Sequence, residues 1–305
     1  MRGLPNLSAS VRDRLTSRAR AHGEDVQLVL LRYAIERLLY RLSRSEYADR
    51  FVLKGAMLFS LWADVPYRAT RDVDLLGYGD SAAERLVETF QAICGVEVEP
   101  DGVEFLAETV RAEQARENDE YQGVRVTLEA RIAGARLSLQ VDIGFGDVVV
   151  PQAQEIEYPG LLDLPTPRLR AYPPETVVAE TFQAMVRFGA VTSRMKDFYD
   201  LWAIATMFGF EGPVLAEAIR ATFERRRTLL PEGTPDALSP EFAGSPTNQS
   251  RWRGFLDRTA IAMAPEPFPA VLAKIRGFVL PPTQSVATGD SFEGAWPPGG
   301  PWRTK

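Results

Sequence analysis

Two aspartates separated by one residue are the strongest chemical signal in this chain. Asp72 and Asp74 flank Val73 near the end of a motif-rich segment, Phe51 to Leu76. Residues two apart on a β-strand point to the same face, so both carboxylates stand together while Val73 turns into the core. Adjacent carboxylates repel each other, and a divalent cation with oxygen ligands relieves that repulsion. The spacing predicts a site for Mg²⁺ (or Mn²⁺), although an isolated Asp-x-Asp is also typical of a solvated strand edge.

The residues before this pair add phosphate-binding chemistry. Gly55 allows a backbone to approach a phosphate closely, and Lys54 and Arg71 bring positive charge to the same neighbourhood. Residues 51–53 are predicted to form a short strand, and residues 56–62 a short helix whose first N–H groups could bind an anion. A phosphate site beside a metal site indicates nucleotide chemistry.

A third carboxylate is predicted on a later strand. Between Ala135 and Ile143 apolar residues alternate strictly with polar ones, which is typical of a strand with one buried face. Leu137, Leu139, Val141 and Ile143 share the buried face, whereas Ser138, Gln140 and Asp142 share the other. Asp142 could therefore join Asp72 and Asp74 on a polar face of the sheet.

The spacing of apolar residues divides the rest of the chain into helical and mixed α/β segments. Apolar spacing predicts helices from Val11 to Leu42, and a mixed α/β pattern runs from Phe51 to Val150. We expect a helix over residues 82–93 and strands around 103–110, 123–130 and 135–143. Residues 151–174 are rich in proline and are expected to cross between domains, with helices beyond them. The expected domains are a helical lead-in (1–50), a core (51–165), a helical domain (166–280) and a disordered tail (281–305).

One predicted helix carries a second polar cluster. In the sequence RMKDFYDLW, Lys196, Asp197 and Asp200 are spaced so that they can share one helix surface. An ordinary intrahelical ion pair beside buried aromatic residues would explain this spacing equally well.

Composition excludes several classes of protein. The chain has 305 residues, 45 % apolar and 25 % charged, as in a water-soluble globular protein. No apolar run is long enough to cross a membrane, so we expect no membrane contact and a cytoplasmic location. Cys94 is the one cysteine and His22 the one histidine, which excludes an internal disulfide and a set of soft zinc ligands. Cys94 is expected to be a small buried residue and not a nucleophile.

The net charge of −6 argues against a protein that coats nucleic acid over its whole surface, but the charge is uneven. Residues 1–50 contain ten arginines against six acids, and Arg225 to Arg227 form a second basic group. These arginines are either phosphate contacts or the solvated faces of helices.

Several motifs of the chain together resemble a known family. Lys-Gly-Ala, then Arg-Ala-Thr-Arg-Asp-Val-Asp-Leu, LQVDIGFGD around Asp142 and RMKDFYDLW are similar to the AbiEii/AbiGii nucleotidyltransferase toxins. These toxins, with the MenT toxins, are a branch of the polymerase-β-like nucleotidyltransferase superfamily. The resemblance covers about Val11 to Leu280. It implies an α+β fold with a mixed sheet, flanking helices and a C-terminal helical domain.

The resemblance also implies roles for the residues. Nucleotidyl transfer displaces pyrophosphate from an NTP, and two cations can assist it. Asp72 and Asp74 would bind both metals, and Asp142 the metal nearer the nucleophile. Lys54, Gly55 and Arg71 would lie against the phosphates. The family carries an essential aspartate in the helix of Asp197 and Asp200, and Lys196 lies beside it.

The sequence departs from the family pattern at two positions that would contact the nucleotide. The family usually has Ala-Glu-Lys-Phe in the preceding helix, whereas this chain has Thr181 in place of the lysine that contacts the triphosphate. Either Lys196 or an arginine such as Arg187 substitutes for it, or activity is reduced or absent. Ala56 stands where the superfamily has glycine or serine, so only its backbone N–H remains as a contact.

Three functions are compatible with these residues. The first, which the resemblance implies, is a metal-dependent nucleotidyltransferase toxin of a toxin–antitoxin or phage-defence pair with an NTP as substrate. Similarity to the MenT toxins implies the 3′ end of tRNA as its acceptor. The second keeps the chemistry but modifies a protein or a small molecule. The third is a degenerate protein that binds a nucleotide or a partner without turnover, because Thr181 replaces the lysine. A cognate antitoxin is the expected protein partner.

Overall fold

The computed structural model describes residues 4–62, 71–115, 123–259, 265 and 267–304. The chain divides into two compact units. Among the described residues, the first comprises residues 4–62, 71–115, 123–146 and 154–171, and the second comprises residues 147–153, 172–259, 265 and 267–304.

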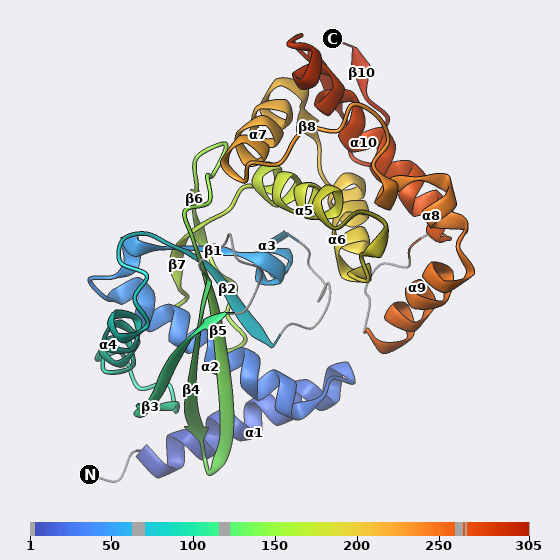
Figure 1. Ribbon diagram of the computed structural model, residues 1–305. Coiled ribbons are helices and arrows are strands. Elements are labelled where there is room, and N and C mark those ends of the chain that lie inside the picture. Colours follow the sequence, from blue (N-terminus) through green and yellow to red (C-terminus); the bar gives the residue numbers. More distant parts are fainter. Residues whose placement is uncertain (1–3, 63–70, 116–122, 260–264, 266, 305) are drawn as a thin grey trace. The chain divides into compact units, whose positions relative to one another are not determined.

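The first unit is built on a mixed sheet of seven strands in the order β3-β4-β5-β2-β1-β7-β6 (Figure 1). The strands are β1 (Phe51–Lys54), β2 (Asp72–Gly77), β3 (Glu104–Ala115), β4 (Gly123–Ile132), β5 (Ala135–Phe145), β6 (Gln154–Glu157) and β7 (Arg168–Ala171). The neighbours β2 and β5 run parallel, as do β1 and β7, and the other neighbouring pairs are antiparallel. The predicted strands are therefore present, but β6 and β7 lie in the proline-rich segment that we expected to cross between domains.

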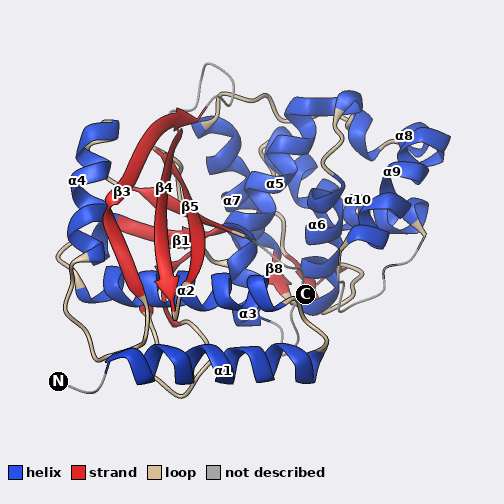
Figure 2. Ribbon diagram, turned by 90° about the horizontal axis from the view of Figure 1, so that it is seen from below, coloured by secondary structure: helices blue, strands red, loops and turns tan. Residues whose placement is uncertain are grey.

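Two long helices cover part of this sheet. They are α1 (Leu4–His22) and α2 (Val26–Arg44), and Figure 2 shows them side by side. Asp25 caps α2 by accepting a hydrogen bond from the backbone N–H of Leu28, at 2.8 Å. A shorter helix, α4 (Ala83–Cys94), packs against β3. The helical lead-in is thus folded onto the same unit as the sheet.

Buried polar contacts fix α2 in place. Arg41 and Asp101 form an ion pair with the Nη1 and Oδ2 atoms 2.6 Å apart, and both side chains are buried. The Tyr33 hydroxyl donates to the Asp101 carbonyl at 2.7 Å. On the same helix, Glu36 accepts from the backbone N–H of Leu161, and Arg37 donates to the Pro165 carbonyl. The loop between β6 and β7 is therefore fastened to α2.

The second unit is mainly helical (Figure 1). Its helices are α5 (Pro174–Phe188), α6 (Met195–Met207), α7 (Gly212–Arg225), α8 (Pro240–Gly244), α9 (Pro246–Arg258) and α10 (Phe268–Thr288). The apolar stripe that predicts α5 is buried at Val178, Phe182 and Met185. In α6, Phe198, Leu201 and Trp202 are likewise buried, so both stripes form the core of this unit.

The end of the chain corrects the prediction of a disordered tail from Pro281. Helix α10 continues through Pro281 and Pro282 to Thr288, and β9 (Gly294–Trp296) and β10 (Arg303–Thr304) follow it. They form a small sheet with β8 (Phe210–Glu211). The reason is aromatic packing, since the rings of Trp296 and Trp302 lie 4.9 and 6.1 Å from that of Phe278.

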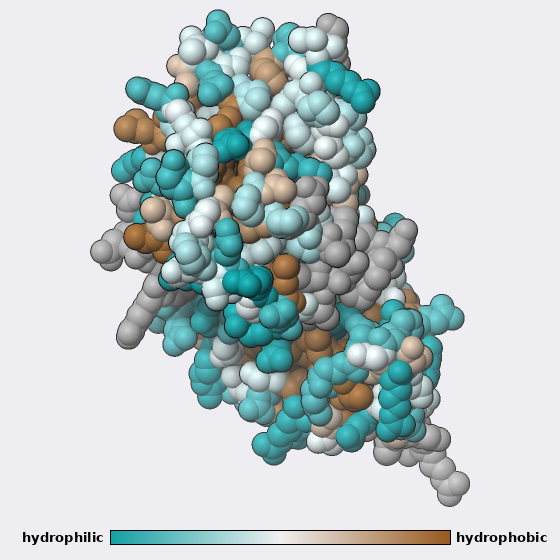
Figure 3. Space-filling model, turned by 90° about the vertical axis from the view of Figure 1, so that its right-hand side faces the viewer, coloured by the Kyte–Doolittle hydropathy of each residue, from teal (hydrophilic) through white to brown (hydrophobic). Residues whose placement is uncertain are grey.

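None of the helices in the described ranges has both the length and the apolarity that a membrane span requires. On the face shown in Figure 3, hydrophobic residues form several separate patches among hydrophilic ones.

Candidate functional site

Four charged residues form a single row across four neighbouring strands of the first unit. Lys54 on β1 is the register partner of Asp74 on β2, which is the partner of Asp142 on β5, which is the partner of Arg125 on β4. Register partners on neighbouring strands lie on the same sheet face. The row therefore places two acids next to each other, with a basic residue at each end.

The expected orientation of the aspartate pair is confirmed. Val73 is 1 % exposed, whereas Asp72 and Asp74 are half-buried on the opposite face of β2. On β5 the apolar set is buried, at Leu137, Leu139, Val141 and Ile143. Asp142 accordingly lies on the polar face, next to Asp74, as the alternation predicts.

Gly55 makes room for one of these carboxylates. Its φ angle is +72°, a left-handed conformation that suits glycine. A Cβ atom built on Gly55 would lie 2.6 Å from Cγ and 2.7 Å from Cβ of Asp74, and would collide with Oδ2. We expected Gly55 to let the backbone approach a phosphate. What the glycine accommodates here is the side chain of Asp74.

Asp142 has protein partners of its own. Nε and Nη2 of Arg125 donate to its two oxygens at 2.8 and 3.1 Å, and Nε2 of Gln140 donates to Oδ2 at 3.0 Å. The hydrogen bond to Asp142 raises the pKa of Arg125 above its ordinary value. Within the described ranges, no three His, Cys, Asp or Glu side chains are grouped so as to hold a metal ion. In this structure Asp142 is paired with Arg125, and the three-carboxylate metal site stays a prediction.

Asp72 and Asp74 by themselves still suit a divalent cation. Both offer carboxylate oxygens from one strand face, and oxygen is the donor that Mg²⁺ requires. Mg²⁺ in phosphate-handling sites is held by one or two carboxylates together with substrate phosphates and water. A pair of aspartates therefore fits this ion without a third acid.

The other predicted residues of the first unit belong to this row or are close in sequence to its members. Lys54 ends β1 and is half-buried, and Arg71 is exposed immediately before β2. Ala56 is 7 % exposed within a 3-10 helix, η2 (Gly55–Leu58), so its side chain offers no contact surface. The α-helix that follows, α3 (Phe59–Trp62), is a single turn and too short to act as a helix-dipole anion site.

The second unit carries the other predicted cluster. On α6, Asp197 and Asp200 are 6 % and 8 % exposed, whereas Lys196 is exposed. Nε of Arg194 donates to Oδ2 of Asp197 at 2.6 Å. Burial raises the pKa of Asp197, and the charge of Arg194 opposes that rise. The two aspartates are therefore buried whereas Lys196 is exposed, and the partner of Asp197 is an arginine outside our predictions.

A buried ion-pair network lies beside Thr181 on α5. Arg226 contacts Asp147 at 3.1 Å, Glu180 at 3.0 Å and the Gln183 side chain at 2.9 Å, and its own side chain is 13 % exposed. The Tyr172 hydroxyl also donates to Glu180. Arg226 was a candidate phosphate contact, but these partners occupy its guanidinium. Thr181 itself is half-buried and uncharged.

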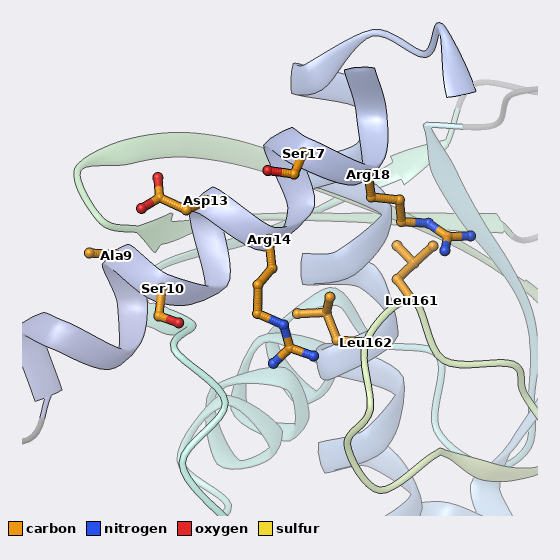
Figure 4. Close-up of a pocket in the computed structure, with 8 residues that line it drawn as sticks. All are labelled: Ala9, Ser10, Asp13, Arg14, Ser17, Arg18, Leu161 and Leu162. Carbon is orange, nitrogen blue, oxygen red and sulfur yellow. The ribbon is translucent and has the colours of Figure 1, made fainter. Parts of the chain in front are cut away.

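An open groove of about 630 Å³ runs between α1 and the loop that α2 fastens (Figure 4). Arg14, Arg18, Ser10 and Ser17 line it from α1, together with Ala9 and Asp13, and Leu161 and Leu162 line it from the loop. In Figure 4 the guanidinium groups of both arginines extend toward the two leucines. The groove contains none of the predicted site residues, but it contains two arginines of the basic lead-in.

Cys94 is half-buried at the end of α4. Burial raises the pKa of its thiol to about 12, so the thiol is protonated near neutral pH. This agrees with the expectation that Cys94 is not a nucleophile.

Comparisons with known proteins give one family match and several similar solved structures. Residues 37–274 match the family model described as nucleotidyl transferase AbiEii toxin, Type IV TA system. No curated protein matches the chain. Among solved structures, a candidate nucleotidyltransferase from H. pylori is similar with a TM-score of 0.51 and 12 % identity, over 88 % of this chain and 100 % of that one. JHP933 from Helicobacter pylori is similar with a TM-score of 0.51 and 13 % identity, over 87 % and 95 % of the two chains. These likenesses show the fold alone, and the expected α+β nucleotidyltransferase fold is confirmed.

Proposed function

Because the chain belongs to the AbiEii nucleotidyl transferase toxin family, we propose that it transfers nucleotides from an NTP to the 3′ end of tRNA in a reaction that requires a divalent cation. The family match makes the protein a nucleotidyltransferase and the toxin of a toxin–antitoxin system, with an antitoxin as its partner. The single observation that supports the proposed chemistry is the half-buried pair Asp72 and Asp74 on one face of β2.

Asp72 and Asp74 are the residues that would hold the cation. A bound Mg²⁺ would neutralise charge on the triphosphate and on the leaving pyrophosphate. Lys54, the register partner of Asp74, and Arg71, exposed before β2, are the cations of the first unit that we assign to phosphate oxygens. In the second unit, we assign Asp197, or else Asp200, as the counterpart of the family's essential aspartate. Lys196, Asp200 and Thr181 would be further nucleotide contacts.

The groove beside α1 supports an RNA acceptor. Arg14 and Arg18 lie four residues apart on the exposed face of α1, and neither has an ion pair within the described ranges. Arginine and serine side chains are frequent contacts of nucleic-acid phosphates. We therefore propose that Arg14 and Arg18 contact the tRNA backbone. The reaction uses NTP and tRNA, both cytoplasmic, so the cytoplasm is the compartment we propose.

The decisive experiment incubates the purified protein with Mg²⁺, each labelled NTP in turn, and total tRNA. Label in the tRNA that is lost when its 3′ end is blocked supports the proposal. Label in protein or in a small molecule would redirect the proposal to another acceptor. Nucleotide binding without any transfer would support the degenerate alternative, in which Thr181 has removed a necessary charge.

A further inference from the structure

The carboxylate of Asp142 is held from two sides. Arg125 approaches from β4 and donates to both oxygens, and Gln140 donates from β5, two residues before Asp142. These are three hydrogen bonds to a group with about four acceptor positions. An Asp142 in this arrangement has little capacity left for a metal ion unless Arg125 moves away.

Arg125, by contrast, has N–H donors that its contact with Asp142 does not use. A guanidinium has five N–H donors, and the bidentate contact with Asp142 uses one on Nε and one on Nη2. Both N–H groups of Nη1 remain, and the described residues supply no acceptor for them. The side chain is 41 % exposed, so an anion from solution can reach it. The geometry thus fixes the guanidinium on one edge and leaves another edge accessible.

The surroundings of Arg125 favour an anion carried with a cation. Arg125 lies in the same cross-strand row as Asp74, one strand beyond Asp142. The negative charges of Glu113 and Asp72 contribute to its raised pKa. A triphosphate that enters with Mg²⁺ brings negative charge to a face where both ends of the row are basic. A planar guanidinium fixed by a carboxylate is well suited to hold phosphate oxygens.

We propose that Arg125 is a further phosphate-binding residue of the nucleotide site, and that Asp142 is the positioning residue that holds it. This inference rests on the function proposed above. In this arrangement Asp72 and Asp74 hold the cation, and Asp142 acts through Arg125. The competing arrangement has Arg125 as a temporary cover that leaves when Asp142 binds the metal.

The two arrangements give opposite results in binding experiments without turnover. Inorganic triphosphate with Mg²⁺ is the first probe, measured by calorimetry, because it is independent of the base that the protein prefers. Mn²⁺ alone is the second probe, followed by its electron paramagnetic resonance signal. The variants are Arg125→Gln, Arg125→Lys, Asp142→Asn and the double variant Arg125→Gln/Asp142→Asn. Arg131→Gln is the matched control, because Arg131 lies on the same face of β4, six residues away.

The proposal predicts that Arg125→Gln weakens triphosphate binding about 10- to 100-fold, the usual effect of one charge-assisted contact. Asp142→Asn should weaken it less, and Arg125→Lys should restore part of it. The double variant should be no worse than Arg125→Gln alone, because Asp142 acts only through Arg125. Mn²⁺ affinity should stay within about twofold in all these variants, since a cation site that also binds phosphate needs only one or two carboxylates. Arg131→Gln should match the natural protein in both measurements.

Three results would overturn the proposal. They are unchanged triphosphate binding in Arg125→Gln, a large loss of Mn²⁺ affinity in Asp142→Asn, or a gain of Mn²⁺ affinity in Arg125→Gln. The last two would show that Asp142 is a metal ligand that Arg125 covers. The proposed function fails separately, if the natural protein binds neither triphosphate nor any NTP in the presence of Mg²⁺.

Discussion

The side chain of Asp74 occupies the space that a side chain on Gly55 would need. Gly55 directly follows β1, and Asp74 is the register partner of its neighbour Lys54, so the two strands bring these residues into contact. Gly55 also has a φ angle of +72°, which strains any residue with a Cβ atom. The Lys-Gly pair and the Asp-x-Asp pair, which are separate in the sequence, are therefore parts of one local structure.

Gly55→Ala should displace Asp74 and reduce both Mn²⁺ affinity and nucleotidyl transfer. We expect the unfolding free energy to fall by about 1–3 kcal/mol from backbone strain alone. Gly134→Ala is the matched control, since Gly134 has a φ angle of +82° with no atom within 4 Å of the added Cβ. The control should lose similar stability in a denaturant titration but retain transfer. Equal transfer by both variants would contradict the steric argument.

Asp72→Ala or Asp74→Ala should abolish transfer and growth inhibition while the fold is kept. Loss of a metal-holding carboxylate removes several kcal/mol of transition-state stabilisation, so we expect a rate at least about 10³-fold lower. Stability should not decrease much, because the substitution also removes like-charge repulsion. Labelled transfer assays and circular dichroism measure the two effects, with the exposed Asp163→Ala as control. A fully active Asp72→Ala or Asp74→Ala protein is incompatible with the assigned site.

Period-two alternation was enough to predict which face of the sheet carries the acids. It placed Asp72, Asp74 and Asp142 on one side because burial on a strand depends only on the parity of position. The alternation within one strand does not reveal which residue of the neighbouring strand lies opposite a given position. Arg125 was missed for this reason, although a two-residue turn pairs Ile132 with Ala135 and fixes the register that brings Arg125 to Asp142.

The C-terminal part was mispredicted because composition is a poor guide to packing. Two consecutive prolines usually end a helix, and Gly, Pro and Ser usually indicate disorder. Here Leu280 and Pro282 are buried, and the Trp302 indole donates to the Phe278 carbonyl at 2.8 Å. Contacts between residues distant in sequence therefore outweigh the local propensity, and a single sequence does not show them.

Thr181→Lys should raise activity if the missing family lysine limits the rate. Thr181 is half-buried on α5, so the flexible stem of a lysine can carry its charge toward solvent. A gain of about one to two powers of ten in kcat/KM is the expected size for one charge-assisted phosphate contact. Thr181→Gln is the neutral control of similar size and should give no gain. No change in Thr181→Lys would indicate that another cation already fills the role.

Arg14→Gln combined with Arg18→Gln should weaken RNA binding at the α1 groove. Removing each phosphate contact should reduce the slope of log affinity against log salt by about one, so a slope smaller by about two is expected. Fluorescence anisotropy with labelled tRNA across several salt concentrations measures this. Arg20→Gln changes an exposed arginine of α1 that does not line the groove, and it serves as control. If the double variant and the control have the same slope, RNA binds elsewhere.

Arg194→Gln should shift the acid limb of the pH–rate profile to higher pH. Burial raises the pKa of Asp197, and Arg194 is the main group that lowers it again. Without that charge the pKa rises further, so the carboxylate is protonated over a wider range. An ionised Asp197 is the form we expect to act, and kcat/KM should therefore fall as pH decreases through the new, higher pKa. Arg194→Lys should keep most of the natural pH–rate profile. Arg253→Gln, at an exposed position on α9, is the control and should leave the profile unchanged.

The raised pKa of Asp197 also determines how the stability of the fold changes with pH. A carboxyl with a folded pKa above its unfolded value makes the fold less stable as pH rises between the two. Because Arg194→Gln widens that interval, thermal unfolding of the variant should show a steeper loss of stability from about pH 4 upward than the natural protein. Parallel curves for the two proteins would refute the coupling between Arg194 and Asp197.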